Sequence, residues 1–153
     1  MNRQINLENI TYRIMKESDM DAIVKIDRKI TGENRADYYE MKMGQHLDEK
    51  HNIVISLVAE HEGKIAGFIM GGVYKGEFGI PDTTAYLDTL GIDPAYQKSG
   101  LGYAMMQRFL DNLRTANIQK LNTFVNWNDW ALLKFFNKTG FKPANTLNLQ
   151  LEL

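Results

Sequence analysis

The sequence contains no cysteine among its 153 residues. A disulfide framework, a zinc site built on thiolates and a cysteine nucleophile are therefore excluded. A chain without cysteine suits a reducing compartment, so we expect a cytoplasmic protein.

An excess of basic residues is also missing. Lysine and arginine together number 18 against 19 aspartate and glutamate residues, which gives a formal net charge of -1 and a pI of about 6.3. Proteins that bind nucleic acid usually carry a basic excess, so no nucleic-acid partner is expected. The chain has no run of about 18 apolar residues, and Met1–Ile10 lacks the apolar core of a signal peptide. Neither a membrane span nor export is expected.

The remaining composition is that of an ordinary globular domain, with 44% hydrophobic and 24% charged residues. No linker, repeat or low-complexity stretch divides the chain, so residues 1–153 are expected to form a single domain. Alternating and helically spaced apolar residues predict the order β-α-α-β-β-β-α-β-α-β. The predicted strands are Thr11–Lys16, Ile53–Glu60, Ile65–Tyr74, Thr83–Ile92, Lys120–Asn126 and Thr146–Leu153.

Helices are predicted between these strands where apolar residues recur at helical spacing. They cover Ile23–Ile30 with a stop at Gly32, Tyr39–Leu47, Gly100–Leu113 and Trp130–Lys138. The turn at His61–Lys64 predicts an antiparallel hairpin, and the crossover from Thr83 to Asn126 predicts two parallel neighbours. The expected fold is of the α/β (α+β) class: a mixed, mostly antiparallel sheet with helices on both faces.

One segment carries a chemical signal. The predicted strand ending at Ile92 leads into Gln97-Lys98-Ser99-Gly100-Leu101-Gly102, where a helix begins. The first amides of a helix have no partners within it and carry the positive end of its dipole. The glycines allow a phosphate to approach the backbone, and Lys98 adds a positive charge. This pattern predicts an anion site suited to a pyrophosphate.

Three kinds of phosphate loop compete for this segment. A P-loop requires Gly-x-x-x-x-Gly-Lys-Ser/Thr, and the sequence contains no such string. A dinucleotide fingerprint requires a third glycine or alanine where Met105 stands, and is expected near the start of a doubly wound sheet. The coenzyme A loop, Gln/Arg-x-x-Gly-x-Gly/Ala, fits without a mismatch.

With this loop the chain resembles the GNAT superfamily, the acetyl-CoA-dependent N-acetyltransferases. A second match is Asn128–Phe141, which looks like the closing helix of that family and ends in its Gly-Phe pair. The element order also matches, so the resemblance covers roughly Tyr12–Leu153. Many relatives have two strands after Gly140-Phe141 and this sequence predicts one. Either the sheet is short at that end or a partner subunit of a homodimer completes it.

The resemblance implies a splayed pair of central parallel strands and acetyl-CoA as co-substrate. It implies that backbone groups of Leu90, Gly91 and Ile92 hold the pantetheine arm and that Asn128 reaches the arm from the opposite side. The implied pyrophosphate-binding residues are Gln97, Lys98, Ser99, Gly100, Leu101, Gly102 and Tyr103. The implied activity is direct acetyl transfer to a primary amine, on a small molecule or a protein, in a ternary complex.

The general acid of the family is missing from its expected place. Relatives often carry a tyrosine four residues before the glycine of the Gly-Phe pair, and this sequence has Phe136 there. Phe136 is then expected to pack beside the coenzyme sulfur, and the acid stays unassigned. This departure keeps a rival function open, a non-catalytic acyl-CoA sensor or regulatory module.

Two carboxylates are candidates for the base. Asp88 lies in an otherwise apolar predicted strand, where a charge is costly unless it is paired or functional. Strict alternation places Tyr86, Asp88 and Leu90 on one face and the residues between them on the other. A purely structural aspartate is the equal alternative. Glu77, in the loop before that strand, is the second candidate, and Tyr38 and Tyr39 with Asp27 and Arg28 are candidates for the facing wall of the acceptor cleft.

The three histidines do not indicate a metal site. His46, His51 and His61 lack metal-ligand spacing and fall in polar surroundings, so no metal is expected and none of them is assigned a role. His61 is expected to be a solvated turn residue.

Overall fold

The structure is a computed structural model that describes residues 5–49, 53–74, 79–80 and 83–153. Two compact units divide the chain, Met1–Thr123 and Phe124–Leu153. The first unit contains every strand of the described residues and three of the helices, and the second contains one helix. The predicted single domain across 1–153 stays a prediction.

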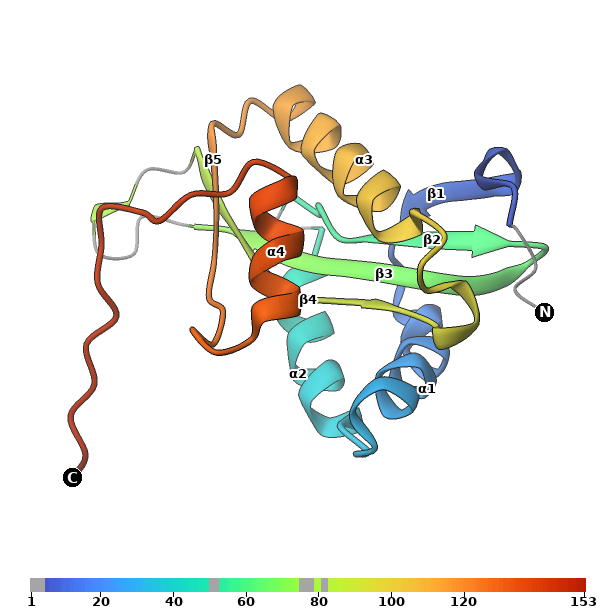
Figure 1. Cartoon of the computed structure of the whole chain (residues 1–153), viewed down its shortest axis with the longest axis horizontal. Helices are drawn as coiled ribbons and strands as arrows, with labels where there is room; N and C mark the ends of the chain where they lie inside the picture. The colour runs from blue at the N-terminus through green and yellow to red at the C-terminus, as the bar shows by residue number, and fades with distance from the viewer. Residues whose placement is uncertain (1–4, 50–52, 75–78, 81–82) are drawn as a thin grey trace. The chain divides into compact units, whose positions relative to one another are not determined.

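Five strands form one sheet in the order β1-β2-β3-β4-β5 among the described residues (Figure 1). Antiparallel pairing joins β1 to β2, β2 to β3 and β3 to β4, and only β4 and β5 are parallel. This confirms the predicted mixed, mostly antiparallel sheet. The strands are β1 Ile10–Ile14, β2 Leu57–His61, β3 Lys64–Val73, β4 Thr84–Ile92 and β5 Lys120–Thr123.

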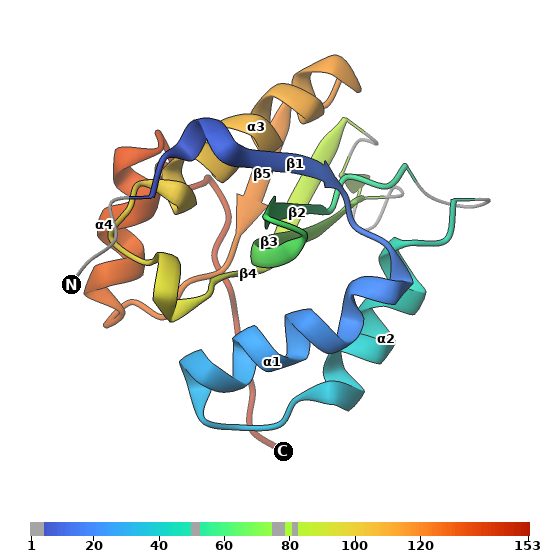
Figure 2. The ribbon, with the colours of Figure 1, turned by 90° about the vertical axis from the view of Figure 1, so that its right-hand side faces the viewer.

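Helices cover both faces of this sheet, as predicted. Figure 2 shows α1 and α2 on one face and α3 on the other. The four α-helices of the described residues are α1 Met20–Thr31, α2 Ala36–His46, α3 Leu101–Thr115 and α4 Trp130–Lys138. The end of α1 is the predicted one, because Gly32 adopts the left-handed conformation at φ 79° and its N–H bonds to the Arg28 carbonyl.

The core of the first unit follows from the helical spacing of apolar residues. Ile23 and Ile26 of α1 pack with Tyr39 and Met43 of α2 against Phe68 of β3. On the other face α3 buries the stripe that its sequence predicts, made of Leu101, Met105, Phe109 and Leu113. The two helix layers therefore hold β3 and β4 from both sides.

The predicted last strand is wrong. Residues 142–153 are described throughout and none of them is in a strand. The alternating leucines of this segment are at least 82% exposed; they are Leu147, Leu149, Leu151 and Leu153. Alternation specifies only which face of a strand is apolar, whereas a strand forms only when its backbone has a partner. For the same reason β5 ends at Thr123 and not at the predicted Asn126.

Candidate functional site

The segment between β4 and α3 is a short, tightly bonded connection. The Asp93 carboxylate accepts a hydrogen bond from the Ala95 amide at 2.9 Å and so caps a single 3-10 turn at Pro94–Tyr96. Lys29 of α1 holds the same carboxylate at 2.6 Å. The Asp93 amide bonds to the Ala66 carbonyl of β3. The loop therefore leaves the sheet in a fixed direction.

The predicted anion site lies in the next turn. Lys98 and Gly100 have φ angles of 59° and 86°, and Gly100 is the N-cap of α3. Residues of alternating backbone hand make successive amide groups converge on one concave point, which is an anion-binding arrangement. The Leu101 side chain is fully buried and its amide donates to the Ser99 hydroxyl, so Leu101 contributes to the shape of the turn. Glycine at position 100 is thus required by its conformation, and the first turn of α3 adds the positive end of its dipole.

Side chains of this turn hold the loop itself. The Ser99 hydroxyl donates to the Tyr96 carbonyl at 2.5 Å and accepts from the Leu101 amide at 3.3 Å. The Gln97 side-chain amide donates to the Ile92 carbonyl at 3.2 Å. Ser99 and Gln97 therefore shape the predicted anion site, while the Lys98 side chain is exposed.

Within the first unit, the half of β4 that leads to this turn has a strand partner on one side only. Pairing between β4 and β5 ends at Leu87 and Thr123, where the Thr123 hydroxyl also bonds to the Leu87 carbonyl at 3.0 Å. The strand β4 continues to Ile92 beyond that point, paired with β3 on its other side. The segment that includes Leu90, Gly91 and Ile92 therefore has no β5 partner, and the predicted splay of the parallel pair stays a prediction. Gly91 itself is explained by packing, since a Cβ atom there would lie 2.7 Å from the Phe68 ring.

Asp88 lies at an irregularity in the sheet. Met70 pairs with Thr89 and Gly71 pairs with Leu87, so Asp88 is an extra residue that β3 does not match. Such a β-bulge interrupts strict alternation. The prediction that Thr89 faces away from Asp88 is therefore wrong, because the Thr89 side chain bonds to Tyr39 of α2. The bulge turns Asp88 and Thr89 toward the same helix.

The Asp88 carboxylate is paired with two cationic or polar side chains of α2. Its Oδ2 atom lies 2.6 Å from His46 Nε2 and 3.0 Å from Lys42 Nζ. All three side chains are mostly buried, with exposed fractions of 14%, 5% and 19% for Asp88, His46 and Lys42. We call these three residues the Asp88 cluster.

The cluster keeps Asp88 ionised. Burial by itself would raise the pKa of Asp88, but the hydrogen bonds and charges of His46 and Lys42 outweigh it and hold the pKa below its ordinary value. A carboxylate with a lowered pKa is a weaker base and a better partner for a cation. Its arrangement therefore suits holding an ammonium group in place more than removing a proton from it.

His46 is the site residue that the sequence interpretation missed. Its ring packs edge-on against Tyr86 at 5.6 Å between centroids and occupies the space beside Gly72, where a Cβ atom would lie 2.6 Å from Nδ1. The one available signal was its position four residues after Lys42, which places both side chains on one face of a helix.

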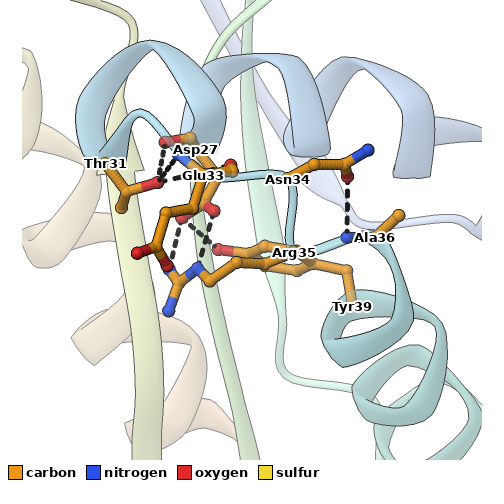
Figure 3. Close-up of polar contacts among 7 residues, drawn as sticks. All are labelled: Asp27, Thr31, Glu33, Asn34, Arg35, Ala36 and Tyr39. Carbon is orange, nitrogen blue, oxygen red and sulfur yellow. Dashed lines mark hydrogen bonds and ion pairs between the residues drawn. The ribbon is translucent and has the colours of Figure 1, made fainter.

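A second buried carboxylate is structural (Figure 3). Arg35 binds Asp27 with two hydrogen bonds of 2.8 and 2.5 Å, and the Tyr39 hydroxyl donates to the same carboxylate at 2.8 Å. Since Tyr39 also bonds to Thr89, this network ties both α1 and α2 to the bulge of β4. Tyr39 is fully buried, so it packs inside the unit and does not line a cleft. Tyr38 is half-buried, with Lys42 Nζ 5.8 Å from its ring.

His61 also lies elsewhere than predicted. It is half-buried at the end of β2, and its Nδ1 atom lies 2.9 Å from the Tyr96 hydroxyl. The expectation of a solvated turn residue is wrong, because the hairpin and the loop before α3 come together at one end of the sheet.

The other predicted site residues lie outside the first unit or outside the described residues. Glu77 falls among residues that the structure does not describe. In the second unit α4 has the predicted bounds, with Asp129 capping it through the Leu132 amide. Asn128 is exposed, and Phe136 is buried with its ring 4.8 Å from that of Phe141. The coenzyme roles of Asn128 and Phe136 stay predictions.

No group of three or more potential metal-ligating side chains is present among the described residues. Among the same residues, every helix is too short or too polar to cross a bilayer.

Comparison with known proteins identifies the family of this chain. The chain matches the model of the Acetyltransferase (GNAT) family over residues 20–141. An acetyltransferase of Yersinia pestis (strain Pestoides F) is 32% identical to it over 110 residues, which cover 72% of each chain. Two solved structures share its fold with a TM-score of 0.73. The ribosomal-protein-S18-alanine N-acetyltransferase from Escherichia coli is 20% identical and the alignment covers 88% of this chain and 79% of that one. An aminoglycoside N-acetyltransferase in complex with CoA is 12% identical, with 94% of each chain covered.

Proposed function

Because the chain belongs to the GNAT acetyltransferase family, we propose that it transfers an acetyl group from acetyl-CoA to a primary amine. The observation that carries this proposal is the concave turn at Lys98–Gly100 placed directly after an open strand edge. A pyrophosphate fits the first element and an extended amide-containing arm fits the second. Coenzyme A contains both groups in that order.

The residues present fit this co-substrate. The amides of the turn and of the first turn of α3, with Lys98, supply positive charge for the pyrophosphate. The edge of Leu90–Ile92 has no strand partner on the β5 side, and its main-chain groups other than the Ile92 carbonyl, which accepts from the Gln97 side chain, can serve the pantetheine amides. We propose these roles for the segment Gln97–Gly102 with Tyr103, and for Asn128 and Phe136 a role at the coenzyme arm.

The chemistry follows from holding two reactants together. The amine nitrogen forms a bond to the thioester carbon, the carbon–sulfur bond breaks, and the coenzyme leaves as a thiolate that takes up a proton. Because no residue of the chain carries a thiol, direct transfer in a ternary complex is the simplest course. Positioning alone supplies much of such an acceleration.

We propose that Asp88 orients the acceptor amine or receives its proton. Its lowered pKa supports the orienting role, since an ionised carboxylate attracts an ammonium group. Glu77 is the second candidate for the base. The acceptor class is a primary amine, and the aminoglycoside and protein-alanine acceptors named for structural neighbours are both amines.

Two further features belong to this proposal. The balanced charge and the missing apolar run support a cytoplasmic location, with neither a membrane nor a nucleic-acid partner. The exposed leucines of the segment 146–153 support a homodimer in which that segment finds a partner.

The decisive experiment has two readouts. Acetyl-CoA should raise the melting temperature, because a ligand that binds only the folded state stabilises it. Thiol release from acetyl-CoA should then appear with at least one member of a library of primary amines. No shift would overturn the proposal. A shift without turnover for any amine would favour the sensor function that Phe136 leaves open.

A further inference from the structure

A hydrogen bond between His61 and Tyr96 joins the β2–β3 hairpin to the loop before α3. Neither side chain has a role in the proposed reaction. His61 is the last residue of β2, and Tyr96 is the last residue of the 3-10 turn before the coenzyme loop. Their contact joins the imidazole Nδ1 to the phenol oxygen at 2.9 Å, with the rings edge-on and 5.5 Å apart. Figure 1 shows the β2–β3 hairpin and this loop at the same end of the sheet.

The histidine side of this contact is fixed. His61 pairs with both Ile10 of β1 and Lys64 of β3. The hairpin turn that follows has positive φ angles at Glu62 and Gly63, 49° and 76°, which is the tight two-residue turn that matches strand twist. The imidazole is therefore carried by a rigid element.

On the other side of this contact, Tyr96 is bonded to the residues that shape the loop. Tyr96 is held through its main chain by the Asp93 carbonyl, at 2.8 Å from its amide. The Tyr96 carbonyl accepts a hydrogen bond from the Ser99 hydroxyl, and that hydroxyl accepts a hydrogen bond from the Leu101 amide. The position of Tyr96 thus sets the position of Ser99 and of the first amide of α3. Ser99 lies between the left-handed residues Lys98 and Gly100, and Leu101 follows them.

We propose that His61 is a positioning residue for the coenzyme-binding loop, acting through the Tyr96 hydroxyl on the Ser99 turn. This inference rests on the proposed function, since it concerns the site proposed for the pyrophosphate. Amides bind a pyrophosphate well only when they already converge before the ligand arrives. His61 anchors the loop to the sheet and so lowers the cost of ordering it on binding.

The test measures the dissociation constant of acetyl-CoA for single and double variants. His61→Ala and Tyr96→Phe each remove the same hydrogen bond, so each should raise this constant about three- to tenfold. The double variant should bind no more weakly than the weaker of the two single variants, because the second change removes nothing further. His61→Asn places an amide atom where Nδ1 stands and should restore binding to within about twofold of wild type.

A second probe separates positioning of the loop from a general loss of stability. The nucleotide 3′-phosphoadenosine 5′-diphosphate carries the pyrophosphate without the pantetheine arm, and its dissociation constant should rise by the same factor. Tyr12→Phe is the matched control. It deletes a phenol oxygen from β1, outside the loop, and should leave both constants unchanged.

Each other outcome overturns the inference. Wild-type affinity in folded His61→Ala would mean that the contact does not shape the loop. Losses that add in the double variant, or that affect acetyl-CoA and spare the nucleotide, would place the action of His61 elsewhere. Failure of wild type to bind acetyl-CoA would overturn the proposed function and this inference with it, whereas normal wild-type binding with an unaffected variant overturns the inference alone.

Discussion

The loop that we propose for the coenzyme, Gln97–Gly102 with the turn before it, and the Asp88 cluster are built in opposite ways. The loop is one continuous stretch after β4 whose inner turns come from main-chain conformation and from bonds between residues at most five apart. Lys29, Ala66 and His61 attach it to the rest of the first unit. The Asp88 cluster brings together side chains that are 42 positions apart in the sequence, on α2 and β4. A site made of backbone keeps its function when most side chains change. A site made of side chains depends on each of them and on the packing of the elements that carry them.

The largest effect on acetyl-CoA binding is expected when a side chain is added to the loop, because the groups proposed to bind the coenzyme there belong to the main chain. Gly100→Glu adds bulk and negative charge beside the phosphates and forces a residue with a Cβ atom to φ 86°. The thermal shift caused by acetyl-CoA should disappear. Gly100→Asn is the control, because asparagine tolerates this conformation and adds no charge. A folded Gly100→Glu that shifts as wild type does would show that the anion site is elsewhere.

The next effect tests the side-chain site. Asp88→Asn should lower turnover at neutral pH by about tenfold or more while leaving acetyl-CoA affinity intact. The reason is that the amide cannot hold an ammonium group or take up its proton, and it also leaves Lys42 without its counter-charge. Initial rates of thiol release and the acetyl-CoA dissociation constant check this pair of statements. Unchanged turnover would remove Asp88 from the mechanism and favour Glu77.

A smaller effect, on stability, is expected for Asp27, the structural carboxylate whose hydrogen-bond network contacts the strand that carries Asp88. Asp27→Asn should reduce the free energy of unfolding by about 1 kcal/mol at pH 7, because Arg35 is partly exposed and the pair is partly screened. Arg35 and Tyr39 hold the pKa of Asp27 below its ordinary value. The stabilisation is therefore complete above the unfolded pKa, about 3.9, and is lost as the pH falls through the lower folded value.

Urea unfolding of wild type and Asp27→Asn at several pH values checks this sign. The difference between the two proteins should be constant from pH 7 to about 5 and should shrink below about 4. A difference that grows on acidification would mean that Asp27 is not held ionised in the folded protein.

The smallest effect is expected for Phe136→Tyr. The change adds one hydroxyl where relatives keep their general acid, so coenzyme affinity should stay within about twofold and turnover should equal or exceed that of wild type. A buried hydroxyl without a partner costs roughly 1–3 kcal/mol, so melting is measured alongside. A folded variant that binds acetyl-CoA normally but turns over tenfold more slowly would show that the phenyl ring itself shapes the reacting site.

The two sites also differ in how far the sequence predicts them. The string Gln97–Gly102 contains its own shape, because a glycine before a helix start specifies both the left-handed residue and the free amides. The sequence placed Asp88 in a buried strand and made it a candidate. It did not indicate His46 or Lys42, since their contact with Asp88 depends on how α2 lies against β4.

The bulge explains why alternation failed within β4. Alternation assigns faces correctly as long as each residue has a partner, and β3 offers none for Asp88. A local pattern contains no information on the register of a distant strand. Thr89 was therefore assigned to the wrong face.

The sequence by itself determined the family, the order of the elements from β1 through α4, and the left-handed turn before α3 that we propose binds the coenzyme, because periodicity and turn chemistry are local properties of the chain. Only the tertiary structure decided which side chains surround Asp88, that His61 supports the loop through Tyr96, and that residues 146–153 lie in no strand. Each of these depends on which distant segment provides the partner, and hydrogen bonds and burial are decided by partners and not by patterns.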